Sequence, residues 1–178
     1  MVDASKQNLS IDTAKANETK MRVAVNLILI NEKGEIYLQL RGGKKAGADT
    51  WAIPGGTQGL LETMEQCIIR EAKEELGIVI KEEDLIYNNM FECLSTPEKH
   101  YFHHAFVCKK WEGTPKNVET EKCKDSRWFS VDAIKKIPRE NMFISYANLD
   151  NYFNGVAYNP KNTIVAYDQE AVLNGQCK

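Results

Sequence analysis

Three glutamates, Glu71, Glu74 and Glu75, follow one another at helical spacing, and Glu62 lies one helix-length upstream. Residues three and four apart lie on the same face of an α-helix, so these three carboxylates share one face. Like charges this close repel one another, and near the C-terminus of a helix they also oppose its dipole. A divalent cation removes this conflict, and clustered carboxylate oxygens suit Mg²⁺ or Mn²⁺. The spacing therefore indicates a metal site.

An alternative is that the acids form an ordinary solvated helix face, because Glu, Lys and Arg are good helix formers. Two features favour the metal site. The acids continue a face that begins with the apolar residues Met64, Cys67 and Ile68, and the helix follows a Pro-Gly-Gly turn. Arg70 falls on the opposite, solvated flank, from which it can pair with Glu74 four residues later.

The helix that carries the acids has recognisable ends. Thr63 and Gln66 form the pattern of a capping box, which makes Thr63 the N-cap. Gly77 lies where a C-cap glycine belongs. Together they predict a helix over about residues 64–76.

The neighbouring elements are predicted from apolar patterning and turn residues. The β-branched stretch 22–30 is typical of a strand, and the alternating stretch 36–42 is expected to pair back on it as a half-buried strand. The remaining predictions are a short strand at 50–56 ended by Pro54, strands at 85–94, 101–111 and 127–131, a polar loop at 112–126, a helix capped by Asp132, and a helical stretch at 141–155. Strands on both sides of a central helix indicate an α/β (α+β) sandwich.

Length and charge restrict the class of protein. The 178 residues suggest a single domain over residues 21–178, behind a polar, flexible tail of residues 1–20 that lacks the apolar core of a signal peptide. The net charge of −2 argues against DNA binding through bulk charge. No apolar run is long enough to suggest a membrane span.

The five cysteines form no CxxC pair, which argues against a zinc site. Reduced thiols and a cytoplasmic location are therefore expected. Cys67 and Cys108 occur in apolar patterns and are predicted to be small core residues.

The stretch from Gly56 to Ile78 resembles the Nudix box, in which a glycine, a glutamate, an Arg-Glu pair, a Glu-Glu pair and a second glycine recur at fixed spacing. The matching residues are Gly56, Glu62, Arg70, Glu71, Ala72, Glu74, Glu75, Gly77 and Ile78. Many relatives carry Glu and Gly where this chain has Gly59 and Leu61, so the loop geometry is in question. Over about residues 22–160 the chain is similar to MutT-like nucleoside di- and triphosphate pyrophosphohydrolases, and most similar to the dimeric enzymes for purine and thiopurine nucleotides.

This resemblance implies a Nudix α/β/α sandwich with a mixed β-sheet between helices, and a homodimer. It also implies that Glu71 and Glu75 are the main ligands of Mg²⁺, with Mn²⁺ as an alternative. Glu74 would assist directly or through water, and the carbonyl of Gly55 would be a further ligand. Arg70 would hold the acids in place, and Glu62 would support the junction of loop and helix.

The general base is left open between three glutamates. Glu74 is one candidate, and Glu119 and Glu121 in the downstream loop are the others, because a glutamate outside the box takes part in several relatives.

Substrate contacts are expected from the loops. Arg41, with the glycines Gly55 and Gly56, is a candidate for binding the nucleotide, and Ile53, Phe143 and Ile144 could enclose the base. Ordinary core packing is the alternative for these apolar residues. Lys44 and Lys45 are equally well explained as phosphate contacts or as a solvated loop. His103 and His104 point to opposite faces of a strand, so they cannot chelate a metal together, although one of them could face the pocket.

The function that follows is hydrolysis of a small-molecule nucleotide. The leading hypothesis is Mg²⁺-dependent cleavage of a canonical or modified nucleoside triphosphate to a monophosphate and pyrophosphate by metal-activated water. Alternatives are the same chemistry on ADP-ribose, a dinucleoside polyphosphate, a nucleotide sugar or capped RNA, and a non-catalytic Nudix module that only binds. An isomerase of isoprenoid diphosphates is disfavoured, because no cysteine lies near the first sheet.

Overall fold

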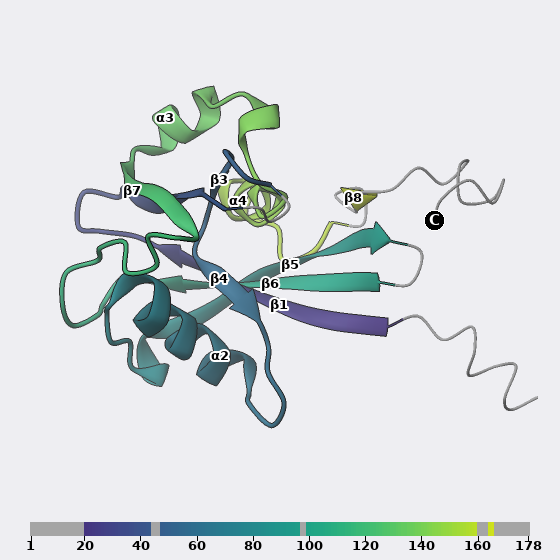
Figure 1. Cartoon of the computed structure of the whole chain (residues 1–178), viewed down its shortest axis with the longest axis horizontal. Coiled ribbons are helices and arrows are strands. Elements are labelled where there is room, and N and C mark those ends of the chain that lie inside the picture. Colours follow the sequence, from purple (N-terminus) through teal and green to yellow (C-terminus); the bar gives the residue numbers. More distant parts are fainter. Residues whose placement is uncertain (1–19, 44–46, 97–98, 160–163, 166–178) are drawn as a thin grey trace, which may run out of the picture.

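The computed structural model describes residues 20–43, 47–96, 99–159 and 164–165 (Figure 1). The strands are β1 (Lys20–Leu29), β2 (Ile36–Arg41), β3 (Trp51–Ala52), β4 (Gly55–Thr57), β5 (Leu85–Thr96), β6 (Lys99–Cys108), β7 (Cys123–Phe129) and β8 (Ile164–Val165). The helices are α2 (Met64–Glu71), α3 (Val131–Lys136) and α4 (Tyr146–Phe153). The shorter turns are the π-helical η1 (Ala72–Leu76) and the 3₁₀ turns η2 (Glu82–Asp84) and η3 (Arg139–Asn141).

The strands form two sheets. The larger has the order β4-β1-β6-β5-β8, in which β1 runs parallel to β6 and β8 runs parallel to β5, while the other pairs are antiparallel. The smaller sheet, β3-β2-β7, is antiparallel. The prediction of a mixed sheet is confirmed.

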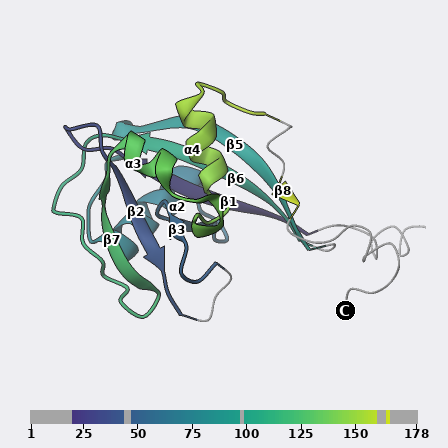
Figure 2. The ribbon, with the colours of Figure 1, turned by 90° about the horizontal axis from the view of Figure 1, so that it is seen from above.

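Helices cover both faces of the larger sheet, with α2 on one side and α4 on the other (Figures 1 and 2). Alternate residues of β1 supply the two cores, as the two-residue period of a strand requires. Val25 and Leu27 pack with Ile68 of α2, whereas Ile28 packs with Leu149 of α4. This arrangement is the α/β/α sandwich that the sequence predicts.

The predicted pairing of residues 36–42 with 22–30 was wrong. Only an isolated bridge joins Ile30 to Ile36, after which β2 enters the smaller sheet beside β3 and β7. The strand is also not half-buried, because Ile36, Tyr37, Leu38 and Gln39 are all buried in succession. Both faces of β2 are covered, so the alternating pattern of its sequence wrongly indicated one solvent-exposed face.

Three further boundaries differ from the predictions. Strand β7 begins at Cys123, inside the predicted polar loop, because it completes the edge of the smaller sheet against β2. Helix α3 is capped by the Ser130 hydroxyl, which accepts from Ala133 N at 3.2 Å, and not by Asp132. In the predicted helix 141–155, only α4 is regular α-helix.

Helix α2 begins where the capping box predicts. Thr63 Oγ1 accepts from Gln66 N at 3.1 Å, and Thr63 N donates to Gln66 Oε1 at 2.9 Å. The α-helical bonding ends at Glu71, however, and η1 continues it as a π-helical turn up to Gly77, whose φ is 69°. The predicted helical bounds of about 64–76 are confirmed, but the last turn, which carries Glu74 and Glu75, is wider than an α-helical one.

The cysteines of the described residues are free and buried, namely Cys67, Cys93, Cys108 and Cys123. The predicted core roles of Cys67 and Cys108 are confirmed, since both pack in the cluster beneath α2. Cys177 and the tail of residues 1–19 lie outside the described residues. In the described part of the chain, no helix is long and apolar enough to cross a membrane.

The loop before α2 contains a strained leucine, which supports a stability prediction. Leu61 has φ 62° and a side chain that is 96% exposed. The left-handed conformation costs a non-glycine residue ~1–2 kcal/mol. Glycine avoids this cost, but the net gain in stability is smaller because glycine has more conformational freedom in the unfolded chain. We expect Leu61→Gly to raise the melting temperature by about 1–3 °C in thermal unfolding. Leu60→Gly is the control, because Leu60 is equally exposed but has no positive φ; an equal gain there would contradict the explanation.

Candidate active site

A pocket with a volume of ≈ 800 Å³ brings most of the predicted site residues together. Its acidic end is formed by Glu71, Glu74, Glu75 and Glu119. Its sheet end is formed by Asn26, Cys93, Tyr101 and His103, from the face of the larger sheet that α4 covers. The other predicted residues that line it are Arg41, Ile53, Gly55, Gly56, Phe143 and Ile144.

The carboxylate of Glu71 rests directly on the backbone of β4. A Cβ atom added to Gly56 would lie 2.0 Å from Glu71 Oε1, so no other residue fits at Gly56 without moving this acid. Glu71 is only 14% exposed and accepts a hydrogen bond from Arg70 Nη1 at 2.8 Å. Gly56 of β4 therefore leaves room for the Glu71 carboxylate against the strand.

Arg70 holds three carboxylates at once. It donates to both oxygens of Glu62, at 2.8 and 3.1 Å, to Glu71 at 2.8 Å and to Glu74 at 3.2 Å. This guanidinium, together with the N–H of Gly59, lowers the pKa of Glu62 to about 2. The predicted pair with Glu74 is present, and the Arg70 side chain is 36% exposed, as expected for a solvated flank.

Glu75 lies deepest among the helix acids. Its Oε2 accepts from Gly55 N at 3.1 Å. Desolvation, together with the nearby charges of Glu71 and Glu119, raises the pKa of Glu75 to about 8, against the opposite effect of the Gly55 N–H and of Arg41. An added positive charge would stabilise this carboxylate as an anion.

The two candidate glutamates of the downstream loop have different positions. Glu119 lines the pocket and forms an ion pair with Lys122, which also lines it. Glu121 is exposed and is not among the lining residues. The sequence did not single out Lys122.

The remaining wall is cationic and aromatic. The guanidinium carbon of Arg41 lies 4.0 Å from the centroid of the Phe143 ring, at cation–π distance. Ile53 is 4% exposed and belongs to the core on the α4 side, so both interpretations of this residue, core and pocket wall, hold. Lys44 and Lys45 lie outside the described residues.

His103 and His104 point to opposite faces of β6, as predicted. His103 lines the pocket and stacks on Phe91, whereas Tyr87 contacts His104 on the other face. The sequence did not identify Asn26 as a pocket residue. A lone asparagine within the otherwise apolar stretch 23–30 was the available signal.

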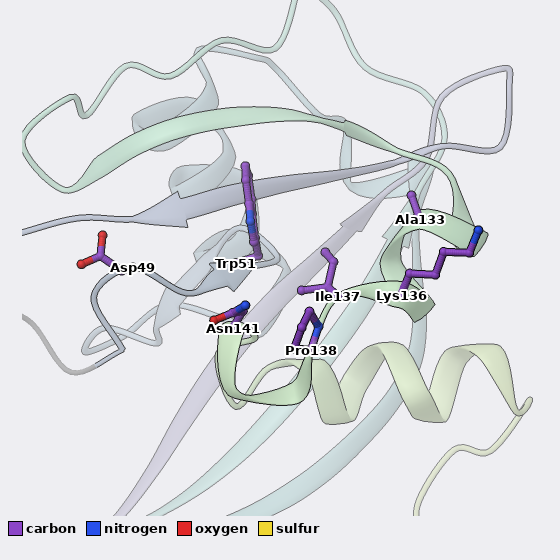
Figure 3. Close-up of a pocket in the computed structure, with 7 residues that line it drawn as sticks. All are labelled: Asp49, Trp51, Ala133, Lys136, Ile137, Pro138 and Asn141. Atoms are coloured by element: carbon purple, nitrogen blue, oxygen red, sulfur yellow. The ribbon is translucent and has the colours of Figure 1, made fainter.

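A second pocket, of ≈ 500 Å³, lies where β3 approaches α3 and η3 (Figure 3). It is lined by Asp49, Trp51, Ala133, Lys136, Ile137, Pro138 and Asn141. Asp49 and Lys136 stand on opposite sides of it, and Asp49 is paired with Lys124. The acidic cluster lies in the larger pocket, which is therefore the candidate active site.

The acidic end fits a divalent cation that is only partly held by protein. Among the described residues, no three His, Cys, Asp or Glu side chains are gathered as a complete ion-binding group. Glu71 and Glu75 each use one carboxylate oxygen, toward Arg70 and Gly55, and their second oxygens take no hydrogen bond from the described residues. Mg²⁺ is typically held by one or two carboxylates, waters and substrate phosphates, so this donor set suits it.

Comparisons with known proteins show the family to which the chain is similar. A family model described as the NUDIX domain matches residues 20–149. The 8-oxo-dGTP diphosphatase of Escherichia coli (strain K12) is 30% identical over 112 residues, which are 63% of this chain and 81% of that protein. The oxidized purine nucleoside triphosphate hydrolase of Danio rerio is 30% identical over 119 residues, 67% of this chain and 71% of that protein.

A solved structure shows the same fold. The MutT NUDIX hydrolase from Burkholderia pseudomallei matches with a TM-score of 0.63 and 23% identity, over 74% of this chain and 97% of that chain.

The fold and the acidic pocket define an enzyme that hydrolyses phosphoanhydride bonds of nucleotides. The chain belongs to the Nudix family and is MutT-like within it. Nudix hydrolases generally use divalent metal ions, in agreement with the donor set of Glu71 and Glu75.

The buried carboxylate of Glu75 predicts a pH-dependent gain in stability for Glu75→Gln when EDTA removes divalent ions. Its pKa rises from the ordinary value of 4.5 to about 8 on folding, so folding takes up a proton between these values and stability falls as the pH rises through them. Gln has no such dependence and keeps an acceptor for Gly55 N. In thermal unfolding, the melting temperature of Glu75→Gln should exceed that of the wild type at pH 9 but not at pH 5. Each kcal/mol of added stability corresponds to about 2–4 °C.

Glu74→Gln is the matched control, because the Glu74 side chain is 52% exposed and its charge is already solvated. An equal pH-dependent gain in this variant would show that the buried position of Glu75 is not the cause.

Proposed function

We propose that the chain is a Mg²⁺-dependent pyrophosphohydrolase that converts a nucleoside triphosphate, canonical or modified, to a nucleoside monophosphate and pyrophosphate. One observation carries this proposal. A single pocket joins a cluster of four carboxylates, suited to a metal and a polyphosphate, to an apolar and aromatic region suited to a nucleobase. The names of the relatives in Escherichia coli and Danio rerio support a nucleoside triphosphate as the substrate.

The acidic end requires a cation before it can take a polyphosphate, because four carboxylates outweigh the charges of Arg41 and Lys122. We assign Glu71 and Glu75 as the main ligands, with Glu74 assisting and the carbonyl of Gly55 as a further ligand. A bound Mg²⁺ would neutralise the phosphate oxygens and acidify the attacking water. Arg70 would keep the carboxylates oriented from behind.

The remaining steps belong to the protein. Arg41 would bind phosphate oxygens from a position fixed by its contact with Phe143. Glu119 is assigned as the general base, because Lys122 engages its Oε1 and its other oxygen is available to take the proton of the attacking water. Ile53, Phe143 and Ile144 would exclude water around the nucleobase. Holding the attacking water, the phosphate and the general base in one geometry supplies much of the rate enhancement in phosphoryl transfer.

The homodimer, the cytoplasmic location and a single domain over residues 21–178 stay predictions from the sequence.

The first test is hydrolysis of a substrate panel with Mg²⁺ or EDTA, with products separated by chromatography. The panel contains canonical and modified dNTPs, ADP-ribose, a dinucleoside polyphosphate and a nucleotide sugar. We expect Mg²⁺-dependent release of a monophosphate and pyrophosphate from triphosphates, and Glu75→Gln should lower kcat/KM by about 10²-fold or more, because metal ions supply several kcal/mol. Turnover of ADP-ribose or the nucleotide sugar alone would contradict the proposed substrate.

The choice of general base is tested by two variants only two residues apart. Glu119→Gln should reduce kcat by about 10²–10⁴-fold, the usual contribution of a general base. Glu121→Gln removes the same charge from an exposed position outside the pocket lining and should leave kcat nearly unchanged. The assignment fails if the two variants lose activity equally.

A further inference from the structure

One polar atom at the sheet end of the pocket is left without a partner. His103 is 6% exposed and lines the pocket, and its Nε2 is buried with no hydrogen bond from the described residues. An unpaired polar atom buried in a protein costs free energy, so such atoms usually serve a ligand or another function. His103 therefore offers a hydrogen-bonding position that the phosphate chemistry does not use.

The ring of His103 is held in a fixed orientation. Its face stacks on Phe91 with the centroids 4.6 Å apart and the planes 10° from parallel, and Phe91 is completely buried. Its other nitrogen, Nδ1, lies 3.3 Å from Nδ2 of Asn26. The ring is thus anchored through its face and through Nδ1, and Nε2 is its one nitrogen without a partner among the described residues.

A chain of three asparagines determines which nitrogen carries the proton. Asn89 Nδ2 lies 3.0 Å from the backbone carbonyl of Asn148, and Asn148 Nδ2 lies 3.2 Å from that of His103. A carbonyl can only accept, so both amides must present their nitrogen there. The Oδ1 of Asn148 then faces Asn26 at 2.9 Å, and Asn26 must present its NH₂ group.

This NH₂ group lies between two acceptors. One hydrogen goes to Asn148 Oδ1 and the other to His103 Nδ1, which must therefore be unprotonated. The proton of a neutral imidazole then lies on Nε2. Burial, together with nearby His104, lowers the pKa of His103 to about 4, in agreement with a neutral ring at neutral pH.

We infer that His103 is a specificity-determining residue whose Nε2–H donates to a carbonyl oxygen of the nucleobase, so that the enzyme prefers oxo-bearing bases to bases with an amine or hydrogen at that position. This inference rests on the proposed function. Two of the other groups at the sheet end, Asn26 and Cys93, are not strong competing donors. Both amide hydrogens of Asn26 are engaged, and burial raises the pKa of the Cys93 thiol to about 11, so it remains a weak, neutral donor.

The direction of the donor gives the selectivity. An exocyclic amine brought to Nε2–H would place two donors against each other, whereas a carbonyl supplies the missing acceptor. A site built around one hydrogen bond discriminates against the analogue that lacks it, because its own polar group then stays unpaired.

The kinetic test compares substrates that differ at one edge of the base. The pairs are dGTP with the 2-aminopurine deoxyribonucleoside triphosphate, and ITP with purine riboside triphosphate, each without the 6-oxo group in its second member. For the wild type we expect kcat/KM to be about 10-fold or more higher for the oxo member, mainly through KM, because the unpaired donor destabilises the complex with the other member.

Two variants separate the hydrogen bond from the shape of the pocket. His103→Phe keeps a ring on Phe91 but has no donor, and it should bring the ratio within each pair close to one. His103→Gln can place an amide N–H near the position of Nε2 and should keep a ratio above one. An unchanged ratio in His103→Phe, or an equal loss for both members of each pair, overturns the inference.

Binding of the monophosphates makes the test independent of catalysis. Calorimetry would compare GMP with 2-aminopurine ribonucleoside monophosphate on the wild type and His103→Phe, without need for turnover. Absence of hydrolysis with a retained preference for GMP would reject the proposed function and keep the inference. Hydrolysis with equal binding of the two monophosphates would keep the proposed function and reject the inference.

The tautomer can be observed directly. In ¹⁵N spectra of the imidazole-labelled protein, with His103→Gln used to assign the signal, the shifts should show a neutral ring protonated at Nε2. A proton on Nδ1 would contradict the hydrogen-bond chain and, with it, the inference.

Discussion

The active site depends on the contact between the backbone of β4 and the carboxylates of helix α2 and the turn that continues it. Glu71 lies against the Cα of Gly56, and Glu75 accepts from Gly55 N. A side chain at Gly56 would displace the Glu71 carboxylate, and Gly55, with φ 152°, is crowded by the carbonyl of Val25. The two glycines thus hold the acids close to the pocket, where β4 meets β1.

The repulsion created by this packing is distributed among several partners. Arg70 compensates Glu62, Glu71 and Glu74, but it makes no hydrogen bond to Glu75 among the described contacts. The deepest carboxylate is therefore the least compensated, and its surroundings favour a positive charge on the pocket side. Arg70 engages both oxygens of Glu62, but only one oxygen each of Glu71 and Glu74.

Much of the acidic end could be predicted because its residues are close in sequence. One capping box, one C-cap glycine and the helical spacing of three glutamates were sufficient to bring these acids to one face. The π-helical turn could not be predicted in this way, since no residue type marks it. The pairing of β2 was also missed, because the turn after β1 suggests a hairpin, whereas the actual partners, β3 and β7, are chosen by tertiary packing.

The sheet end was harder to predict because its residues are distant in sequence. Asn26, Asn89, His103 and Asn148 come from three strands and a helix, and none of them has a local pattern. The sequence did show that His103 and His104 face opposite sides, but which one faces the pocket depends on where α4 packs. The polar network is therefore a property of the assembled fold and not of any segment.

The parallel pairing of β1 with β6 has a consequence for folding. Asn26 and His103 become neighbours only when strands more than seventy residues apart pair at the centre of the sheet, a contact that carries a large loop-closure entropy and slows folding. The sheet end of the pocket consequently cannot open by fraying of a terminus or a loop; losing it requires breaking the central strands. A ligand bound there would therefore oppose unfolding of the whole domain, and its concentration would determine the added stability.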